Sequence, residues 1–265
     1  MHRGNKYLRL KSVAILSASL LTLATVPAAQ AATFFFNLSG NSGLSGSYGN
    51  ARTFSATTGS TTINVRATAW SVSSNTVRSA FLGAFGNGLG VTNRSESDGS
   101  GNSHTMDNSG QNDFILLQFD KAVEFLSGRF TTYQLSGLSY QDSDATIDYG
   151  TTATSWNTSL ALDNTNISVV NGLLNGVRYE ALGGSAANGV VRDLQPGAPG
   201  QKVGNIWMVA SSFINQDGKK DSFKFDDLSV SYIDPLPEPG SGALLLAGFG
   251  MIGFVLRRRS SLSAA

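Results

Sequence analysis

The stretch TTINVRATAWSVS, residues 61–73, decides the fold class because the character of its side chains alternates along the chain. Ile63, Val65, Ala67 and Ala69 fall on one side of an extended backbone, and the residues between them are mostly polar. A repeat of two residues is the signature of a β-strand that buries one face. The stretch therefore predicts a strand over residues 61–73.

Similar short runs lie on both sides of this stretch, and no segment between the two termini shows helical spacing of its apolar residues. Turn-forming pairs such as Asn175-Gly176 and Asp217-Gly218 separate the runs. Many short strands joined by such turns predict an all-β fold, an antiparallel β-sandwich or jelly-roll-like domain over residues 32–234. The other expected strands are 34–38, 114–119, 122–125, 129–135, 145–149, 167–170, 205–212 and 222–233. Residues 40–49 and 183–200, rich in Gly, Ser and Pro, are expected to be long loops.

The composition supports one large folded domain and excludes several kinds of site. The chain has 265 residues, of which 41% are hydrophobic and 15 are Phe, which is enough for a real core. Cys is absent, so disulfides, thiolate nucleophiles and Cys-ligated metals are excluded. Two His residues are too few for a His-rich metal site.

Residues 1–31 have the layout of a signal peptide. Four basic residues and no acidic ones precede an apolar run over residues 12–26, and Ala29-Gln30-Ala31 then supplies small residues for a signal peptidase. Cleavage is expected between Ala31 and Ala32. The alternative is an uncleaved membrane anchor, for which the apolar run is somewhat short.

The other end of the chain, residues 235–265, has three elements in a fixed order. Pro237, Glu238 and Pro239 come first, an apolar span over residues 243–256 follows, and Arg257, Arg258 and Arg259 come next. The span is about long enough for a thin or tilted membrane crossing, and the Arg cluster would hold its end at the cytoplasmic face. Hydropathy by itself also allows an ordinary C-terminal tail anchor.

Acidic residues gather in the polar segment that precedes the expected strand at residues 114–119. Like charges in one loop repel one another, and a bound cation would relieve that repulsion. The ordinary interpretation is a solvated loop whose Asp and Asn side chains form Asx-turns. The alternative is a structural Ca²⁺ ion, because carboxylate and amide oxygens are the ligands it prefers. Its candidate ligands are Glu96, Asp98, Asp107, Asn108 and Asp113, joined by Asp142 and Asp144 from a second acidic run.

The C-terminal order of Pro-Glu-Pro, apolar span and Arg cluster resembles the PEP-CTERM sorting signal. A tail of this kind also carries the label of an ice-binding protein C-terminal motif, which describes the tail and not an activity. The resemblance implies that an exosortase, a membrane-embedded thiol transpeptidase, recognises Pro237, Glu238 and Pro239 and removes the tail. It also implies export by a Gram-negative-type bacterium, with signal peptidase and exosortase as partners.

The central segments resemble one subgroup of PEP-CTERM exosortase-dependent surface proteins. The residues that carry this resemblance are GLGVTN at 88–93, Glu96, His104, Asp107, Asn108, Asp113, Asp142, Asp144, the aromatic strand 206–210 and Asp221–Lys224. The resemblance implies a secreted β-sandwich that passes the inner membrane and ends at the cell surface or in an extracellular matrix, such as the exopolysaccharide of a biofilm. It brings no established activity.

The sequence favours a non-catalytic role. His104 is the only His after residue 31, and no Gly-x-Ser-x-Gly element accompanies it. The alternative function is a carbohydrate-binding, lectin-like module, possible with or without calcium, because aromatic rings stack on sugars. Trp156, between Ser155 and Asn157, is the candidate for an exposed ring, whereas Trp207 is expected in the core.

Charge separates the two ends of the chain from its middle. The whole chain has 19 basic and 18 acidic residues, but residues 32–239 keep all 18 acidic and 12 of the basic ones, a net charge of −6. An acidic domain without a basic patch lacks the positively charged surface that nucleic-acid binding requires. Membrane contact is expected only through the terminal segments. A divalent cation is a suitable partner for the net negative charge of residues 32–239.

Overall fold

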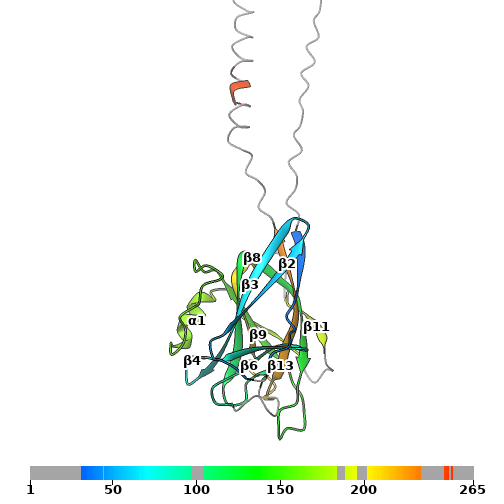
Figure 1. Ribbon diagram of the computed structural model, residues 1–265, viewed down its shortest axis with the longest axis vertical. Coiled ribbons are helices and arrows are strands. Elements are labelled where there is room, and N and C mark those ends of the chain that lie inside the picture. Colours follow the sequence, from blue (N-terminus) through cyan, green and yellow to red (C-terminus); the bar gives the residue numbers. More distant parts are fainter. Residues whose placement is uncertain are drawn as a thin grey trace, which may run out of the picture. The chain divides into compact units, whose positions relative to one another are not determined.

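The computed structural model describes residues 31–43, 45–96, 104–183, 189–195, 202–233, 248–250 and 252. Residues Ala29–Pro235 form one compact unit (Figure 1). Every strand pairing among the described residues is antiparallel, which confirms the all-β prediction. The strands are β1 Ala31–Asn37, β2 Ala51–Thr58, β3 Thr61–Ser73, β4 Thr76–Ser79, β5 Phe81–Phe85, β6 Gly88–Thr92, β7 Met106–Asp107, β8 Asn112–Thr132, β9 Ala145–Gly150, β10 Tyr179–Ala181, β11 Val190–Asp193, β12 Gly204–Ser211 and β13 Ser222–Ile233, and the helix is α1 Ile167–Leu173.

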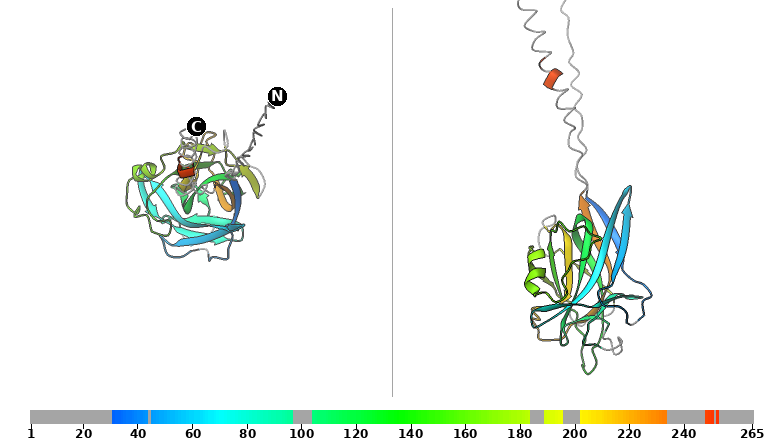
Figure 2. Two further views of the ribbon diagram at one scale, coloured as in Figure 1. Left: turned by 90° about the horizontal axis from the view of Figure 1, so that it is seen from above. Right: turned by 60° about the vertical axis from the view of Figure 1, so that its left-hand side comes forward.

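The long strand β8 joins two sets of strands. Its first part, up to Phe119, pairs with β3 on one side, and with β12 on the other. Its last part, from Glu124 to Thr132, pairs with β13 and β11. We call the strands around the first part, β2, β3, β4, β9, β10 and β12, the first strand set, and β1, β5, β6, β7, β11 and β13 the second strand set. Figure 2 shows the strands of the unit from two further directions.

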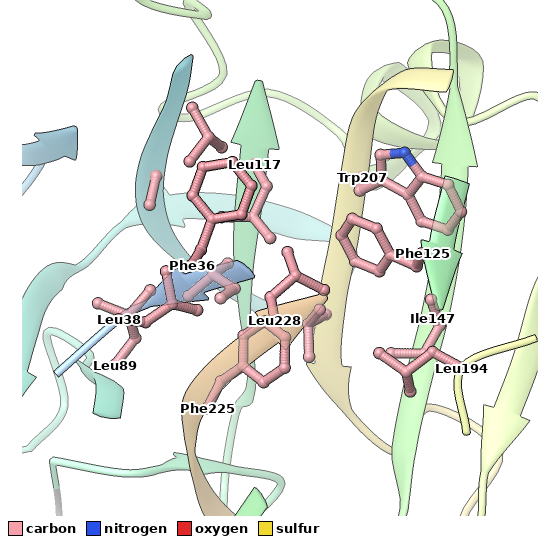
Figure 3. Packing of buried hydrophobic residues seen from close by; sticks show 14 of the residues in the cluster. Phe36, Leu38, Leu89, Leu117, Phe125, Ile147, Leu194, Trp207, Phe225 and Leu228 are labelled. Atoms are coloured by element: carbon pink, nitrogen blue, oxygen red, sulfur yellow. The ribbon is translucent and has the colours of Figure 1, made fainter. Parts of the chain in front are cut away.

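The main core takes its side chains from both strand sets. Phe36 of β1 and Leu228 of β13 come from the second set, and Trp207 of β12 comes from the first, while β8 contributes Leu117 and Phe125 (Figure 3). All five are at most 1% exposed. Burial of this apolar surface is the main force that holds the strands together.

The alternating stretch at residues 61–73 is the strand β3, as its pattern predicts. Ile63, Val65, Ala67 and Ala69 are completely buried in the main core. Trp70, on the other face, is also buried because a second apolar cluster covers that face. This second cluster includes Phe114, Ile206 and Val170, the last of these from α1.

The run at residues 167–170 is helical, so the prediction of a strand there is wrong. Asn166 caps the first turn of α1, because its side-chain oxygen accepts a hydrogen bond from the backbone of Ser168. Such a cap satisfies a free N–H at a helix N-terminus and favours the helix over the β-branched character of the run. Val170 then packs in the second cluster, which explains how tertiary packing overrides the local preference.

Three other expectations differ from the structure. The runs at 114–119, 122–125 and 129–132 are not separate strands but parts of the continuous β8, which ends before residues 133–135 of the third expected strand. The segment 183–200, expected as a loop, contains β11. The pair Asn171-Gly172, whose sequence is typical of a turn, lies inside α1 instead.

The expected signal peptide, residues 1–31, lies outside the described residues except for Ala31. The expected apolar span, residues 243–256, is described only at 248–250 and 252, which are helical. Among the described residues, no helix has both the length and the apolar character needed to cross a membrane.

Candidate metal centre

The hairpin of β5 and β6 leads the chain into the acidic segment. Gly88 has a φ of +104°, and a Cβ on it would lie 2.4 Å from the backbone of Asp226 in β13. Only glycine fits this conformation and this close approach. The sequence GLGVTN therefore holds β6 against β13 and brings the next residues, from Asn93 to Glu96, to the same end of the strands as β7 and the start of β8.

The first acidic cluster consists of Glu96, Asp107 and Asp113, which offer carboxylate oxygens within 4.8 Å of one another. Asn93 hydrogen bonds to two members of this cluster. Its backbone N–H donates to Glu96 Oε2 at 2.6 Å, and its side-chain amide donates to Asp113 Oδ1 at 3.1 Å. The backbone of Ser109 donates to Asp107 Oδ1 at 2.8 Å. These donors orient the three carboxylates toward one another.

Burial of the first cluster makes its negative charges costly. Burial and the nearby Asp107 raise the pKa of Glu96 to about 8. Burial raises the pKa of Asp107 to about 6, although hydrogen bonds to its ionised form oppose the shift. Burial, Asp107 and Glu96 together hold the pKa of Asp113 well above its usual value. At neutral pH the cluster therefore keeps protons unless a cation offsets the repulsion.

The second acidic cluster consists of Asp142, Asp144 and Asp221, all of them buried. The turn before β9 supplies the first two, and the residue just before β13 supplies the third. Ser222 N donates to the backbone O of Asp142 at 2.9 Å, and Asp144 N donates to Asp221 Oδ1 at 2.7 Å. The start of β13 is thus bonded directly to the acidic turn.

Asn108 holds Asp221 in place from the other side. Its side-chain amide donates to Asp221 Oδ2 at 2.7 Å, and its Oδ1 accepts from the backbone N–H of Asp221 at 2.9 Å. Burial, Asp144 and Asp142 raise the pKa of Asp221 to about 8. Burial raises the pKa of Asp142 as well.

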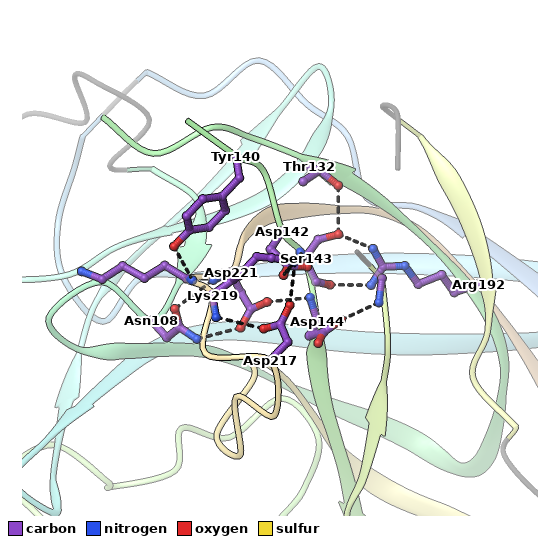
Figure 4. Close-up of polar contacts among 12 residues, drawn as sticks. Asn108, Thr132, Tyr140, Asp142, Ser143, Asp144, Arg192, Asp217, Lys219 and Asp221 are labelled. Carbon is purple, nitrogen blue, oxygen red and sulfur yellow. Dashed lines mark hydrogen bonds and ion pairs between the residues drawn. The ribbon is translucent and has the colours of Figure 1, made fainter. Parts of the chain in front are cut away.

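Two cationic side chains border the second cluster (Figure 4). The guanidinium of Arg192 donates to the backbone O and Oγ of Ser143 and to the backbone O of Ala181. Lys219 Nζ lies 2.9 Å from Asp217 Oδ2 and 3.8 Å from Asp142 Oδ2. Hydrogen bonds from the backbone and side chain of Lys219 lower the pKa of Asp217 to about 2, so this fourth carboxylate is ionised.

The predicted ligands fall into separate groups. Glu96, Asp107 and Asp113 come together in the first cluster, and Asp142 and Asp144 belong to the second. Asn108, predicted with the first group, hydrogen bonds to the second cluster instead. Asp98 lies outside the described residues.

Asp221 was not among the predicted ligands. Its only signal in the sequence is its position at the start of the Asp-x-Phe-Lys segment, immediately before a strand. Asp148 of β9 belongs to neither cluster, and Arg178 Nε pairs with its Oδ2 at 3.0 Å. That carboxylate therefore has a cation of its own.

Comparison with known proteins gives one match. Residues 235–259 match the family model described as the PEP-CTERM protein-sorting motif. The chain carries a PEP-CTERM sorting motif. The match includes Pro237, Glu238, Pro239 and the three Arg residues, and it confirms the predicted sorting signal. No curated protein and no solved structure matches the chain significantly.

The PEP-CTERM motif indicates what happens to the chain, not what its β domain does. It indicates export through the membrane and exosortase-dependent sorting to the cell surface. The match covers the tail alone, so neither acidic cluster lies within it.

The Trp residues differ in their surroundings. Trp207 is fully buried, as expected, and Trp70 is 4% exposed. Trp156 is half-buried in the segment after β9, where Ser155 Oγ donates to Asn157 Oδ1 at 2.9 Å. His104 is also half-buried, and its ring centroid lies 4.9 Å from that of Phe85.

Proposed function

We propose that this chain is a non-catalytic surface protein of a bacterial extracellular matrix, delivered there by exosortase after signal-peptide removal. The observation that carries the proposal is the PEP-CTERM motif at residues 235–259, which follows directly on a compact β domain. The working protein is then the acidic part of the chain, and its final place is the cell surface or the exopolysaccharide of a biofilm.

The proposed architecture of the working domain is a β-sandwich in which the two strand sets face each other across the main core. Its support is the composition of that core, to which β1 and β13 contribute from one set and β3 and β12 from the other. The strand β8 would act as the shared border, since each of its halves pairs with a different set. Two antiparallel sheets that pack face to face in this way are typical of cell-surface modules.

Burial of the acidic groups supports the non-catalytic part of the proposal. A catalytic carboxylate must come within hydrogen-bond reach of a substrate atom. Asp113 is 0% exposed, Asp107 and Asp142 are 1% exposed, and Asp144 is 7% exposed. Carboxylates in such positions are suited to holding the fold together, not to contact with a polymer outside it.

Removal of residues Pro237–Ala265 should abolish sorting in a host that has an exosortase. The expected result is a chain that is neither cleaved at the tail nor delivered to the surface, measured by immunoblots of membrane, surface and medium fractions. A matched control lacks only Ser260–Ala265, keeps all three elements of the motif and should be sorted normally. Identical processing and release of the full-length chain and of the chain without Pro237–Ala265 would contradict the proposal.

Carbohydrate binding is the second candidate, and it depends on Trp156, because Trp70 and Trp207 are buried. An aromatic ring with hydroxyl and amide neighbours suits a sugar, and Ser155 and Asn157 flank this ring. Binding of this kind would attach the domain to the exopolysaccharide of the matrix.

The Trp156→Ala variant should lose about tenfold in affinity for host exopolysaccharide, equivalent to ~1.4 kcal/mol. The measurement is a polysaccharide pull-down in which the bound fraction of protein is determined at increasing polysaccharide concentrations. Phe35→Ala is the matched control, since Phe35 is 59% exposed on β1 and outside the Trp156 segment. Equal losses in both variants would indicate non-specific adsorption, and no retention of the unaltered protein would exclude this function.

A further inference from the structure

The second acidic cluster contains a carboxylate oxygen for which the described structure supplies no hydrogen-bond donor. Asp142 Oδ1 accepts from the backbone N–H of Ser143 at 2.8 Å, but Oδ2 accepts no hydrogen bond from any described residue. The Asp142 side chain is 0% exposed, so water does not replace the missing donor at its surface. A buried carboxylate oxygen that accepts no hydrogen bond is costly, and it marks a place where a ligand belongs.

The oxygens around it add to the negative charge and do not relieve it. The carboxylates of Asp144 and Asp221 lie within 4.8 Å of that of Asp142. Asp217 also borders Asp142 and raises its pKa.

The two cationic side chains beside the second acidic cluster do not satisfy Asp142 Oδ2. The guanidinium of Arg192 donates to Ser143 and Ala181, which are neutral acceptors, while its charge acts on Asp144, Asp142 and Asp221 from the border of the cluster. Lys219 is bonded to Asp217, and its 3.8 Å distance from Asp142 Oδ2 exceeds a hydrogen bond. Neither cation therefore donates a hydrogen bond to Asp142 Oδ2, and this oxygen stays available to a further cation.

The first acidic cluster lacks this feature. Both oxygens of Asp113 accept from the side chain of Asn93, and both oxygens of Asp107 accept from Ser109 or Thr105. Calcium binding by Glu96, Asp107 and Asp113 therefore stays a prediction from the sequence.

We propose that Asp142, Asp144 and Asp221 bind one Ca²⁺ ion, and that the ammonium group of Lys219 stands at the entrance and competes with it. All of the ligands are carboxylate oxygens, the hard donors that Ca²⁺ prefers, whereas zinc and copper favour nitrogen or sulfur. Opposite oxygens on a Ca²⁺ ion are separated by about 5 Å, and on Mg²⁺ by about 4.2 Å. The 4.8 Å limit on the spacing of the ligand atoms thus accommodates Ca²⁺ with little movement.

Two further features fit the site to this role. Asn108 grips both the backbone and the carboxylate of Asp221, which makes it a positioning residue behind the ligand. The Lys219 side chain is 46% exposed while Asp142 is covered, so the entry path from solvent passes Lys219. The site does not depend on sorting, and it would exist in the domain whatever its partner.

The test is a calorimetric titration of the exported full-length protein, stripped with EDTA and purified in detergent, with CaCl₂ alone. Asp142→Asn should lower the affinity of one Ca²⁺ site by at least ~100-fold, because it replaces an anionic ligand at the orphaned oxygen. Asp120→Asn is the matched control, since Asp120 is bonded to Asn64 outside both clusters. Titration with MgCl₂ should give markedly weaker binding.

A second pair of variants keeps the test decisive if Asp142→Asn does not fold. Lys219→Met should bind Ca²⁺ about tenfold more tightly, because the competing ammonium group is gone. Lys121→Met removes the same charge beside Tyr232, away from the cluster, and should leave the affinity unchanged. The proposal is overturned by no binding at 10 mM Ca²⁺, by equal affinity in Asp142→Asn and the unaltered protein, or by equal affinity in the two Lys variants.

Discussion

Trp207→Ala should lower the free energy of unfolding of the domain by ~4 kcal/mol. Trp207 is 0% exposed and lies at the centre of β12, between β8 and β9. Its ring stacks on that of Phe125, with a distance of 3.9 Å between the ring centroids and an interplanar angle of 8°. The ring centroid of Tyr149 lies 5.0 Å from that of Trp207. The substitution would leave a large cavity where both strand sets meet, and close-packed cores collapse only partly around such cavities.

The substitution also removes a hydrogen bond that the Trp207 side chain makes to the backbone. The indole Nε1 donates to the backbone O of Gly204 at 3.0 Å, at the point where the pairing of β12 with β8 shifts register. We expect β12 to lose order there, so the loss in stability is large against the 5–15 kcal/mol typical of folded domains.

Urea unfolding followed by circular dichroism measures this loss. Trp207→Phe retains an aromatic ring and should cost clearly less, which gives a graded result even if the Ala variant is unfolded at the start. Trp156→Ala removes the same side chain from a half-buried position and should change stability by less than ~1 kcal/mol. An unfolding midpoint for Trp207→Ala equal to that of Trp156→Ala would contradict the assignment of Trp207 to the core.

Some parts of this fold could be predicted because their signal is local. The alternation in residues 61–73 fixed the face of β3 that enters the core, and the limits of that strand and of β13 match the expectation. The pair Asp226-Asp227 interrupts the apolar alternation of residues 222–233, and it lies where β13 shifts register against β8. A pair of acidic residues inside an alternating run indicates that the strand is interrupted. Only the pairing with the partner strand shows whether the chain turns there or forms a bulge.

Other parts depend on contacts between distant residues. β6 contains Gly88 because β13 approaches it closely and Gly90 because the backbone of His104 does, and nothing in the run GLGVT itself reveals these neighbours. Asp221 joins Asp142 and Asp144 across the pairing of β13 with the acidic turn, at a separation of nearly 80 residues. The acidic composition could indicate that a cation site was worth seeking, but the division into two clusters could not be predicted without the strand register.

In the metal-free protein, stability should fall as the pH rises from 5 to 8. Glu96 and Asp221 have folded-state pKa values raised from 4.5 and 3.8 to about 8, and that of Asp107 is raised to about 6. A carboxyl group with a raised pKa binds its proton more tightly in the folded chain than in the unfolded chain. Its stabilising contribution is therefore complete below the unfolded pKa and is lost as the pH rises through the folded value.

The charged groups that face these carboxylates do not cancel the effect in this pH window. Lys220 lies near Asp107, and Arg192 and Lys219 border Asp142 and Asp144. Lys224 lies over the rings of Phe85 and Tyr133, and burial lowers its pKa to about 8, so this side chain stays charged through most of the window. The pKa of Asp217, at about 2, lies below the window.

The melting temperature in EDTA should decrease by at least ~10 °C between pH 5 and pH 8, since each pKa unit corresponds to ~1.4 kcal/mol and each kcal/mol shifts the melting temperature of a domain of this size by ~2–4 °C. Differential scanning calorimetry in buffers of equal ionic strength measures it. Asp113→Asn keeps the shape of a fully buried side chain but removes its charge, so it should raise the melting temperature at pH 8 and flatten the pH profile. Asp120→Asn should leave the profile unchanged. A melting temperature that stays constant or rises over this window would show that the acidic clusters do not carry the electrostatic strain that their burial implies.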